Sequence, residues 1–279
     1  MAIKNKENKM IFMIGIDVHC HITHMENPES VVREAMQKLS AIVTVTAEIS
    51  HAEQALELRS KFPDFVFVSL GLHPEYCMKY SGKEIDSYMK LIRRSRKDVC
   101  AIGEVGLDYS WITKSDEQER SKEIFIQMIG LAKELKLPLE IHSRNSDRQK
   151  TAIHDTLKIL TDEDAKDVVM HCFSGSEDEM KYATENGYYI SFATIVCKSK
   201  KHQRLAGICN IDSMLLETDS PWLDPDEPTH GVRQAVSELK NRPWKIRQSA
   251  QLIAEIKQLS MDEVLRITEE NAKRIFRID

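Results

Sequence analysis

Short β-forming runs alternate with helical patterns along the whole chain, and this alternation constrains the fold more than any other feature of the sequence. Several of the runs are continuously apolar, as expected when helices cover both faces of a parallel sheet. The eight candidate strands are Phe12–Ile16, Ala41–Ala47, Phe65–Leu70, Val99–Val105, Leu137–Ile141, Val168–His171, Tyr188–Phe192 and Met214–Thr218. We therefore expect an α/β fold, a single (β/α)8 TIM barrel with C-terminal helices. An open doubly wound sheet is the alternative.

Two helix starts are marked by capping-box patterns, in which a serine precedes a glutamate or glutamine by three residues. Ser115 and Gln118 fit this pattern at the start of a long helix, and Ser260 and Glu263 fit it near the C-terminus. No Gly/Ser-rich or Pro-rich linker interrupts the alternation of strands and helices. We therefore expect residues 1–279 to form a single barrel domain.

Composition and charge narrow the class of protein. Apolar residues make up 42% and charged residues 30% of the 279 residues, which is typical of a folded globular chain. The net charge of −5 argues against general coating of nucleic acid, but it does not exclude a nucleic-acid enzyme with a locally positive mouth. The N-terminal apolar run is about one strand long, too short for a membrane span, and it lacks the layout of a secretory signal. We expect a cytoplasmic protein without membrane contact, and no protein partner is indicated.

Side chains suited to metal binding occur at the carboxyl ends of the candidate strands. In a barrel these ends form the face that carries the active site. His19 and His21 lie two positions apart on a strand, so both imidazoles point to the same side. Four histidines and two carboxylates from five strands form the expected ligand set: His19, His21, Glu104, His142, His171 and Asp219.

The order of the strands divides these ligands between two metal ions. The first and last strands become neighbours when a barrel closes, so His19, His21 and Asp219 are expected to hold one ion. His142 and His171 come from adjacent strands and are expected to hold the other. Two metals roughly 3.5–4 Å apart can clamp both the attacking and the leaving oxygen of a displacement reaction. The pattern predicts a hydrolytic site.

Two carboxylates have further expected roles in this site. Glu104 has two oxygens and can bridge the two ions. Asp219 is expected to take a proton from the attacking water while it touches a metal. Two divalent cations are the expected cofactors: nitrogen-plus-carboxylate ligands suit zinc, manganese or iron, and magnesium is a less natural partner of histidine.

Other polar residues would surround the same mouth. Asp17 shares its strand face with the two histidines and is expected to orient a ligand, with weak ligation as the alternative. Glu217 is equally consistent with a structural role at the rim or with substrate contact. Arg144, His73 and Lys198 are expected to bind a substrate phosphate. An ordinary ion pair, a loop cap or a solvated charge run is the alternative for each.

Taken together, the motifs resemble the TatD-type metal-dependent deoxyribonuclease family, a branch of the amidohydrolase-like TIM barrels. They occur in family order along nearly the whole chain. The matching segments are Ile16-Asp-Val-His-Cys-His21, Gly71-Leu-His-Pro74, Ala101-Ile-Gly-Glu-Val-Gly-Leu-Asp-Tyr109, Leu137-Pro-Leu-Glu-Ile-His-Ser-Arg144, His171-Cys-Phe-Ser-Gly175, Leu215-Leu-Glu-Thr-Asp-Ser-Pro221 and Glu270-Asn-Ala-Lys-Arg-Ile-Phe276.

The resemblance implies a divalent-metal hydrolase that cleaves DNA phosphodiesters, often from the 3′ end, with the same six residues as ligands. The family pattern places Asn-x-Pro after the final aspartate, and Asn241-Arg-Pro243 is the best match here. The stretch Trp222–Lys240 between them is longer than usual, and we expect it to lie over the mouth.

Three functions are consistent with these features. A deoxyribonuclease, a 3′–5′ exonuclease that prefers single strands, is the leading hypothesis, with DNA as its partner. A metal-dependent amidohydrolase acting on a small amide, lactone or phosphoester is the second, and a non-catalytic binding protein on the same barrel is the third. For a nuclease, Tyr109, Trp222 and Trp244 are candidates for stacking on unpaired bases, with packing against the rim as the alternative.

Overall fold

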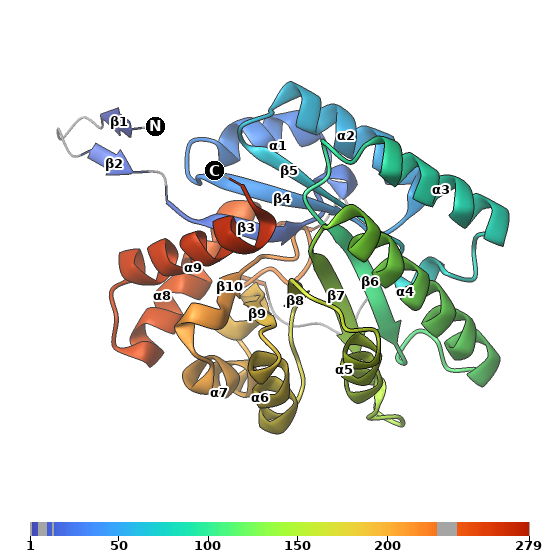
Figure 1. Ribbon diagram of the computed structural model, residues 1–279. Helices are drawn as coiled ribbons and strands as arrows, with labels where there is room; N and C mark the ends of the chain where they lie inside the picture. The colour runs from blue at the N-terminus through green and yellow to red at the C-terminus, as the bar shows by residue number, and fades with distance from the viewer. Residues whose placement is uncertain (1, 5–9, 13, 228–238, 279) are drawn as a thin grey trace.

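The computed structural model describes residues 2–4, 10–12, 14–227 and 239–278. Eight parallel strands form the centre of the molecule, and helices surround them (Figure 1). The strands are β3 (Ile16–Cys20), β4 (Ala41–Thr46), β5 (Val66–Leu70), β6 (Ile102–Asp108), β7 (Leu139–Arg144), β8 (Val168–Met170), β9 (Tyr189–Phe192) and β10 (Met214–Leu216). The expected α/β barrel is therefore confirmed.

Two ladders and two single bridges make up the ring of strands. One ladder runs β10-β9-β8-β7-β6 and the other runs β3-β4-β5. A parallel bridge between Cys20 and Ser220 joins β3 to the end of β10, and a second between Ser69 and Ala101 joins β5 to the start of β6. The first and last barrel strands are therefore neighbours, as the sequence predicts.

Helices follow the barrel strands and cover them from outside. They are α1 (Pro28–Ala35), α2 (Ala52–Lys61), α3 (Gly82–Arg94), α4 (Ser115–Leu135), α5 (Ala152–Asp162), α6 (Glu177–Glu185), α7 (Lys200–Ile208), α8 (Ile246–Lys257) and α9 (Met261–Phe276). A separate hairpin of β1 (Ala2–Lys4) and β2 (Met10–Phe12) stands away from the barrel (Figure 1). No described helix is long and apolar enough to cross a membrane.

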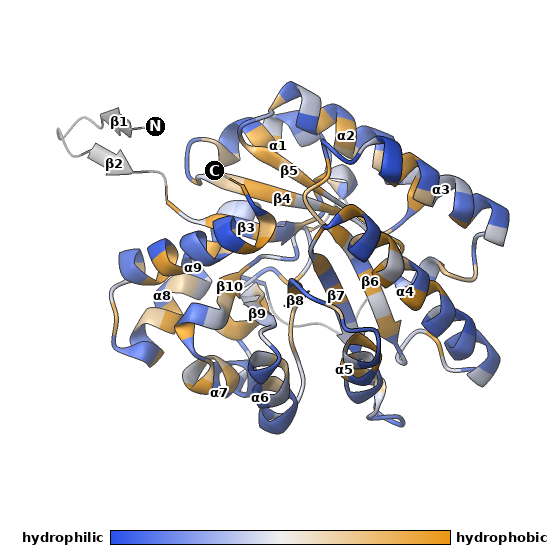
Figure 2. Cartoon of the chain, in the orientation of Figure 1, coloured by the Kyte–Doolittle hydropathy of each residue, from blue (hydrophilic) through white to orange (hydrophobic). Residues whose placement is uncertain are grey.

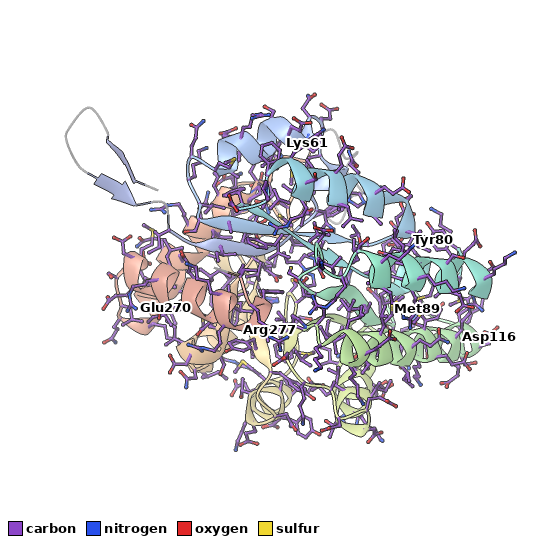
Figure 3. The ribbon with its side chains drawn as sticks, turned by 45° about the horizontal axis from the view of Figure 1, so that its top comes forward. Lys61, Tyr80, Met89, Asp116, Glu270 and Arg277 are labelled. Atoms are coloured by element: carbon purple, nitrogen blue, oxygen red, sulfur yellow. The ribbon has the colours of Figure 1, made fainter. Side chains whose placement is uncertain are left out.

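The hydrophobic core lies in two places. The larger part lies between strands and helices, where Figure 2 shows apolar strands under helices with polar outer faces. The smaller part fills the barrel interior, where Val18, Val43 and Leu215 meet Phe276 at the end of α9. Single side chains in Figure 3 show the contrast between the inner and outer faces of the helices. Met89 of α3 is buried, whereas Asp116 and Glu270 reach solvent. The apolar cluster around Phe276 closes one end of the barrel, and the polar side chains gather at the opposite end.

Several expected boundaries were wrong. The first barrel strand is Ile16–Cys20 and not Phe12–Ile16, because parallel pairing with β4 begins only at Ile16. The fourth is Ile102–Asp108 and not Val99–Val105, because pairing with β7 continues from Gly106 to Asp108. Backbone pairing continues through polar residues whose side chains turn to the mouth. The candidate ligands His19 and Glu104 therefore lie within strands.

One expected capping box was also wrong. Lys114 is the N-cap of α4 and makes no side-chain cap bond, and the Gln118 amide donates instead to the carbonyl oxygen of Ile112 at 2.9 Å. The box at α9 is confirmed. Ser260 accepts a hydrogen bond from the backbone N–H of Glu263, and the Glu263 carboxylate accepts one from the backbone N–H of Ser260.

Candidate metal centre

Three candidate ligands meet where β3 and β10 lie side by side. The Nε2 atoms of His19 and His21 are 3.1 Å apart. The Asp219 Oδ1 atom lies 3.3 Å from Nε2 of His21 and 4.0 Å from Nε2 of His19. Asp219 also lies near His171, which follows β8, because ligand atoms of His19, His171 and Asp219 lie within 4.8 Å of one another. The Asp219 carboxylate therefore lies near His171 as well as near His19 and His21, the two histidines that strand order predicts as its neighbours.

Glu104 lies between two pairs of histidines. Its Oε2 atom is 3.7 Å from Nε2 of His19 and 3.8 Å from Nε2 of His21. Its Oε1 atom is 2.7 Å from Nδ1 of His142 and 3.6 Å from Nε2 of His171. One carboxylate oxygen thus faces each pair, which is the arrangement that a bridging carboxylate requires.

Glycine lets the Glu104 strand approach its neighbour closely. Gly106 has φ +144°, and a Cβ at this position would lie 1.9 Å from the carbonyl oxygen of His142. Only a residue without a side chain fits such an approach. Gly106 therefore allows β6 and β7 to bring Glu104 and His142 into contact.

Two of the candidate ligands have an oxygen acceptor beside the ring nitrogen Nδ1. Nδ1 of His21 lies 3.0 Å from the carbonyl oxygen of Val45, so this nitrogen carries the proton and donates. Nδ1 of His171 lies 2.9 Å from Oε1 of the Glu217 carboxylate without hydrogen-bond geometry, and the closeness of this acceptor favours a proton on Nδ1. In both rings Nε2 keeps its lone pair and faces Glu104. A metal-binding histidine has this arrangement.

The other two candidate ligands also have carboxylate partners. Nε2 of His142 lies 2.8 Å from Oδ2 of Asp108, so Nδ1 is the nitrogen turned to Glu104. Nδ1 of His19 lies 3.5 Å from Oε1 of the buried Glu140. The donor set thus fits divalent cations, and each of the four histidines has an oxygen acceptor near its second ring nitrogen.

His73 has the reverse arrangement. Its Nδ1 accepts a hydrogen bond from the backbone N–H of Glu75 at 3.1 Å, so the proton lies on Nε2. Burial and the neighbouring His142 lower the pKa of His73 to about 3, which keeps the ring neutral. Nε2 lies 3.8 Å from Oε1 of Glu104 and has no free lone pair for a metal. His73 therefore faces the centre as a hydrogen-bond donor.

The electrostatics of the centre favour charged carboxylates. Burial opposes ionisation of Glu104, but the surrounding histidines outweigh it and hold the pKa of its carboxyl well below the usual range. Burial likewise opposes ionisation of Asp219, and its contact with His21 leaves the pKa lowered. Both groups are therefore ionised at neutral pH, which is the state that binds metal.

Glu217 and Asp17 hold the centre from behind. Glu217 is fully buried and contacts His171 and the backbone N–H of Cys172, so of the two roles left open for it the structure favours the structural one. The Asp17 carboxylate accepts hydrogen bonds from the backbone N–H and hydroxyl of Thr218, at 2.9 and 2.6 Å. It thereby ties β3 to the segment that carries Asp219.

Comparison with known proteins of similar sequence and structure assigns this chain to a family. A family model described as TatD related DNase matches residues 16–277. The chain belongs to the TatD-related DNase family. This TatD-family chain is 30% identical over 273 residues to human "Deoxyribonuclease TATDN3", covering 94% of each protein. It is 32% identical over 265 residues to "Uncharacterized metal-dependent hydrolase MJ1582" of Methanocaldococcus jannaschii, covering 94% of this chain and 96% of that one.

Solved structures agree with this assignment. The TatD homologue YJJV of Escherichia coli superposes with a TM-score of 0.79 at 25% identity, covering 95% of this chain and 98% of that one. A phosphotriesterase homology protein of the same organism superposes at 0.64 and 14% identity, covering 95% and 99%. The second likeness concerns the fold alone. The TatD-family protein is thus a metal-dependent hydrolase, and the predicted family is confirmed.

Two of the expected phosphate-binding side chains differ in whether they already have a hydrogen-bond partner. Arg144 is exposed at the end of β7, and its guanidinium makes no hydrogen bond or ion pair with the described residues. Lys198 is already engaged, because its Nζ donates to the carbonyl oxygen of Asp224 at 2.5 Å. The loop that contains Asp224 continues into residues 228–238, so the expected covering of the mouth lies outside the described residues.

Asn241 supports the loop that follows Asp219. Its Nδ2 donates to the carbonyl oxygens of Thr218 and Trp222, at 2.9 and 2.5 Å.

Of the expected stacking residues, Tyr109 is buried and donates its hydroxyl to Asp155. Trp222 is part-exposed beside the centre, with its ring 5.0 Å from that of His21.

Proposed function

We propose that this chain is a nuclease that cleaves DNA phosphodiester bonds, removing nucleotides from the 3′ ends of single strands. The observation that carries the proposal is the position of Glu104, with one carboxylate oxygen facing each pair of histidines. Two divalent ions bridged in this way suit hydrolysis of a phosphodiester. The printed name of the human relative, a deoxyribonuclease, supports DNA as the substrate.

The cofactors are proposed to be two divalent cations, zinc, manganese or magnesium. The first would be held by His19, His21 and Asp219, and the second by His142 and His171. Glu104 would contact both. When bound, such ions lower the pKa of water and neutralise charge that develops on phosphate oxygens.

The remaining steps belong to residues of the chain. Asp219 is the most exposed carboxylate of the centre, with 19% of its side chain accessible against 5% for Glu104. It is ionised, so it can take the proton of the attacking water as the water oxygen forms its bond to phosphorus. The bond from phosphorus to the 3′-oxygen of the shortened strand then breaks, and this oxygen leaves with a proton from solvent water. His73 donates its Nε2–H to a phosphate oxygen. Arg144 adds two parallel N–H donors, and Lys198 adds positive charge at the rim.

The test uses metal-depleted protein reloaded with manganese, magnesium or zinc and assayed on oligonucleotides. Wild type should shorten 3′-labelled single-stranded DNA stepwise, and more slowly the same strand in a duplex. Glu104→Gln and Asp219→Asn should each lower the rate by roughly 1,000-fold or more, because each acts at the reacting centre. Glu123→Gln, an exposed change on α4, is the matched control and should retain full rate.

The outcomes separate the parts of the proposal. Cleavage that yields internal fragments would replace the exonuclease mode with an endonuclease mode. Cleavage of RNA at the same rate would remove the preference for DNA. Wild-type protein that is loaded with metal and leaves every DNA substrate intact would reject the nuclease function.

A further inference from the structure

Three aromatic rings lie beside the candidate metal centre and take no part in holding the metals. They belong to His24, His51 and Trp222, and we call this cluster the ring wall. The His24 ring lies 4.1 Å from that of His51 and 5.2 Å from that of Trp222, centre to centre. The Trp222 ring stands edge-on to the candidate ligand His21, at 5.0 Å. The ring wall therefore begins at the metal centre.

The ring wall leads outward from the centre along the active face. The exposed fraction of the side chain rises from 4% for His21 to 22% for His51. His24 ends the 3-10 helix Ile22–His24 after β3, and His51 ends the 3-10 helix Ile49–His51 after β4. Trp222 follows β10, the other neighbour of β3. Loops after three adjacent strands thus supply the three rings, and such loops carry substrate sites in barrels.

Packing does not explain the histidine at position 24. Its Nδ1 atom is buried and makes no hydrogen bond, whereas Nδ1 of His51 contacts the hydroxyl of Thr23 at 2.9 Å. A buried polar atom without a partner lowers stability, and a phenylalanine or leucine would avoid this cost. A flat polar ring at this place points to a contact outside the fold itself.

We propose that the ring wall binds the base of a nucleotide that flanks the scissile phosphate, by stacking. This inference rests on the proposed nuclease function and adds a subsite to it. Every base has a flat face, so a wall of rings binds bases without regard to sequence. Stacking of this kind lowers KM by roughly 5- to 100-fold.

The experiment compares variants on two kinds of 3′-labelled single-stranded DNA. One is an ordinary oligonucleotide, and the other carries a tetrahydrofuran residue, which has no base, at either of the last two positions. His24→Leu and Trp222→Leu should raise KM for ordinary DNA by roughly 5- to 100-fold and leave kcat within roughly 3-fold. Phenylalanine at either position should keep KM near wild type, because a ring remains.

The base-free substrates identify the contact. With one of the two tetrahydrofuran positions, wild type and the leucine variants should have equal KM, because no base is present to stack. His154→Leu, on the exposed surface of α5, is the matched control. Metal content and Tm of each variant show whether the centre and the fold are intact. His24→Leu should keep its metal, and its Tm should equal or exceed that of wild type.

Each remaining outcome counts against the ring wall or against the nuclease. Leucine variants with wild-type KM on ordinary DNA would overturn the ring wall alone. A rise in KM that is equal on ordinary DNA and on both base-free substrates would also overturn it. Loss of metal together with the rise would assign the rings to support of the centre instead. Wild type that cleaves no DNA would overturn the proposed function, and the subsite with it.

Discussion

At the scale of single residues, the partner of the second ring nitrogen decides what each histidine can do. His21 donates to a backbone carbonyl and His171 approaches a carboxylate, so each keeps a lone pair for the centre. His73 accepts a hydrogen bond from the backbone N–H of Glu75, which places its proton toward the centre. The hydrogen bond from the Glu75 backbone therefore makes His73 a hydrogen-bond donor toward the centre, whereas the other histidines remain candidate ligands.

Replacement of Glu217 by glutamine tests the support behind His171. The glutamine keeps the shape of the side chain but can turn an N–H toward Nδ1, which favours the wrong tautomer of the ligand. We expect the affinity for divalent metal to fall roughly 10- to 100-fold, since partners of this kind tune affinity by that amount. Competition with a chromophoric chelator measures it. Glu123→Gln should bind metal as wild type does, and equal affinity in E217Q would contradict the supporting role.

Replacement of His73 by alanine tests the donor assignment. We expect kcat on DNA to fall by roughly 100-fold, because one hydrogen bond to the transition state is lost. Metal content should remain at the wild-type level, because the Nε2 atom carries a proton and cannot be a ligand. Elemental analysis and single-turnover rates on the same sample check both points. If the metal is lost along with the activity, His73 is a ligand and the tautomer derived from Glu75 is wrong.

At the scale of elements, hydrophobic runs located the barrel strands but missed several boundaries. The run before Ile16 was expected to be a barrel strand, yet the strand begins where that run ends. Parity along a strand correctly placed His19 and His21 on one side, because alternation survives an error in the boundary. The same parity could have identified Asp108 and Glu140 as site residues, because they lie four positions from Glu104 and two positions from His142, respectively. Which oxygen of Glu104 faces which pair depends on contacts between distant strands, and no local pattern contains that information.

Helix α7 carries a histidine that makes stability depend on pH. Burial lowers the pKa of His202 to about 4, whereas an unfolded histidine titrates near 6.5. Between these values the unfolded chain binds a proton that the folded chain excludes, so the unfolding free energy falls as pH drops from about 6.5 to about 4. Above pH of about 6.5 the group contributes no pH dependence. The slope is at most about 1.4 kcal/mol per pH unit.

Urea denaturation at pH 7.5 and pH 5 tests this dependence in wild type and His202→Gln. Wild type should lose more stability between the two values than the variant does. His24 and His73, with pKa values lowered to about 3, act in the same direction in both proteins, so the difference isolates His202. The exposed change His154→Gln should behave as wild type. Parallel losses in wild type and H202Q would show that His202 is not buried in its neutral form.

At the scale of the whole molecule, the candidate centre lies across the seam where the barrel closes. Asp17 and Thr218, 201 positions apart, are joined by two hydrogen bonds at this seam. His19 and His21 lie on one side of it and Asp219 on the other, while Glu104 reaches across from β6. Cations held by these residues would connect the first and last strands of the barrel. Metal binding and the stability of the closed barrel should therefore be coupled.

Removal of metal measures this coupling. Binding to the folded chain alone adds about 4 kcal/mol to the unfolding free energy at a free cation concentration about a thousand times the dissociation constant. For a chain of this size, that corresponds to a rise in Tm of roughly 8–16 °C. Chelation should therefore lower Tm by this amount, and added manganese should restore it. Glu104→Gln should show a much smaller shift, because the two proposed ions would both lose a ligand, whereas Glu123→Gln should show the wild-type shift. If chelation leaves the Tm of wild type unchanged while bound metal is verified before and after, the cations do not connect the strands at the seam.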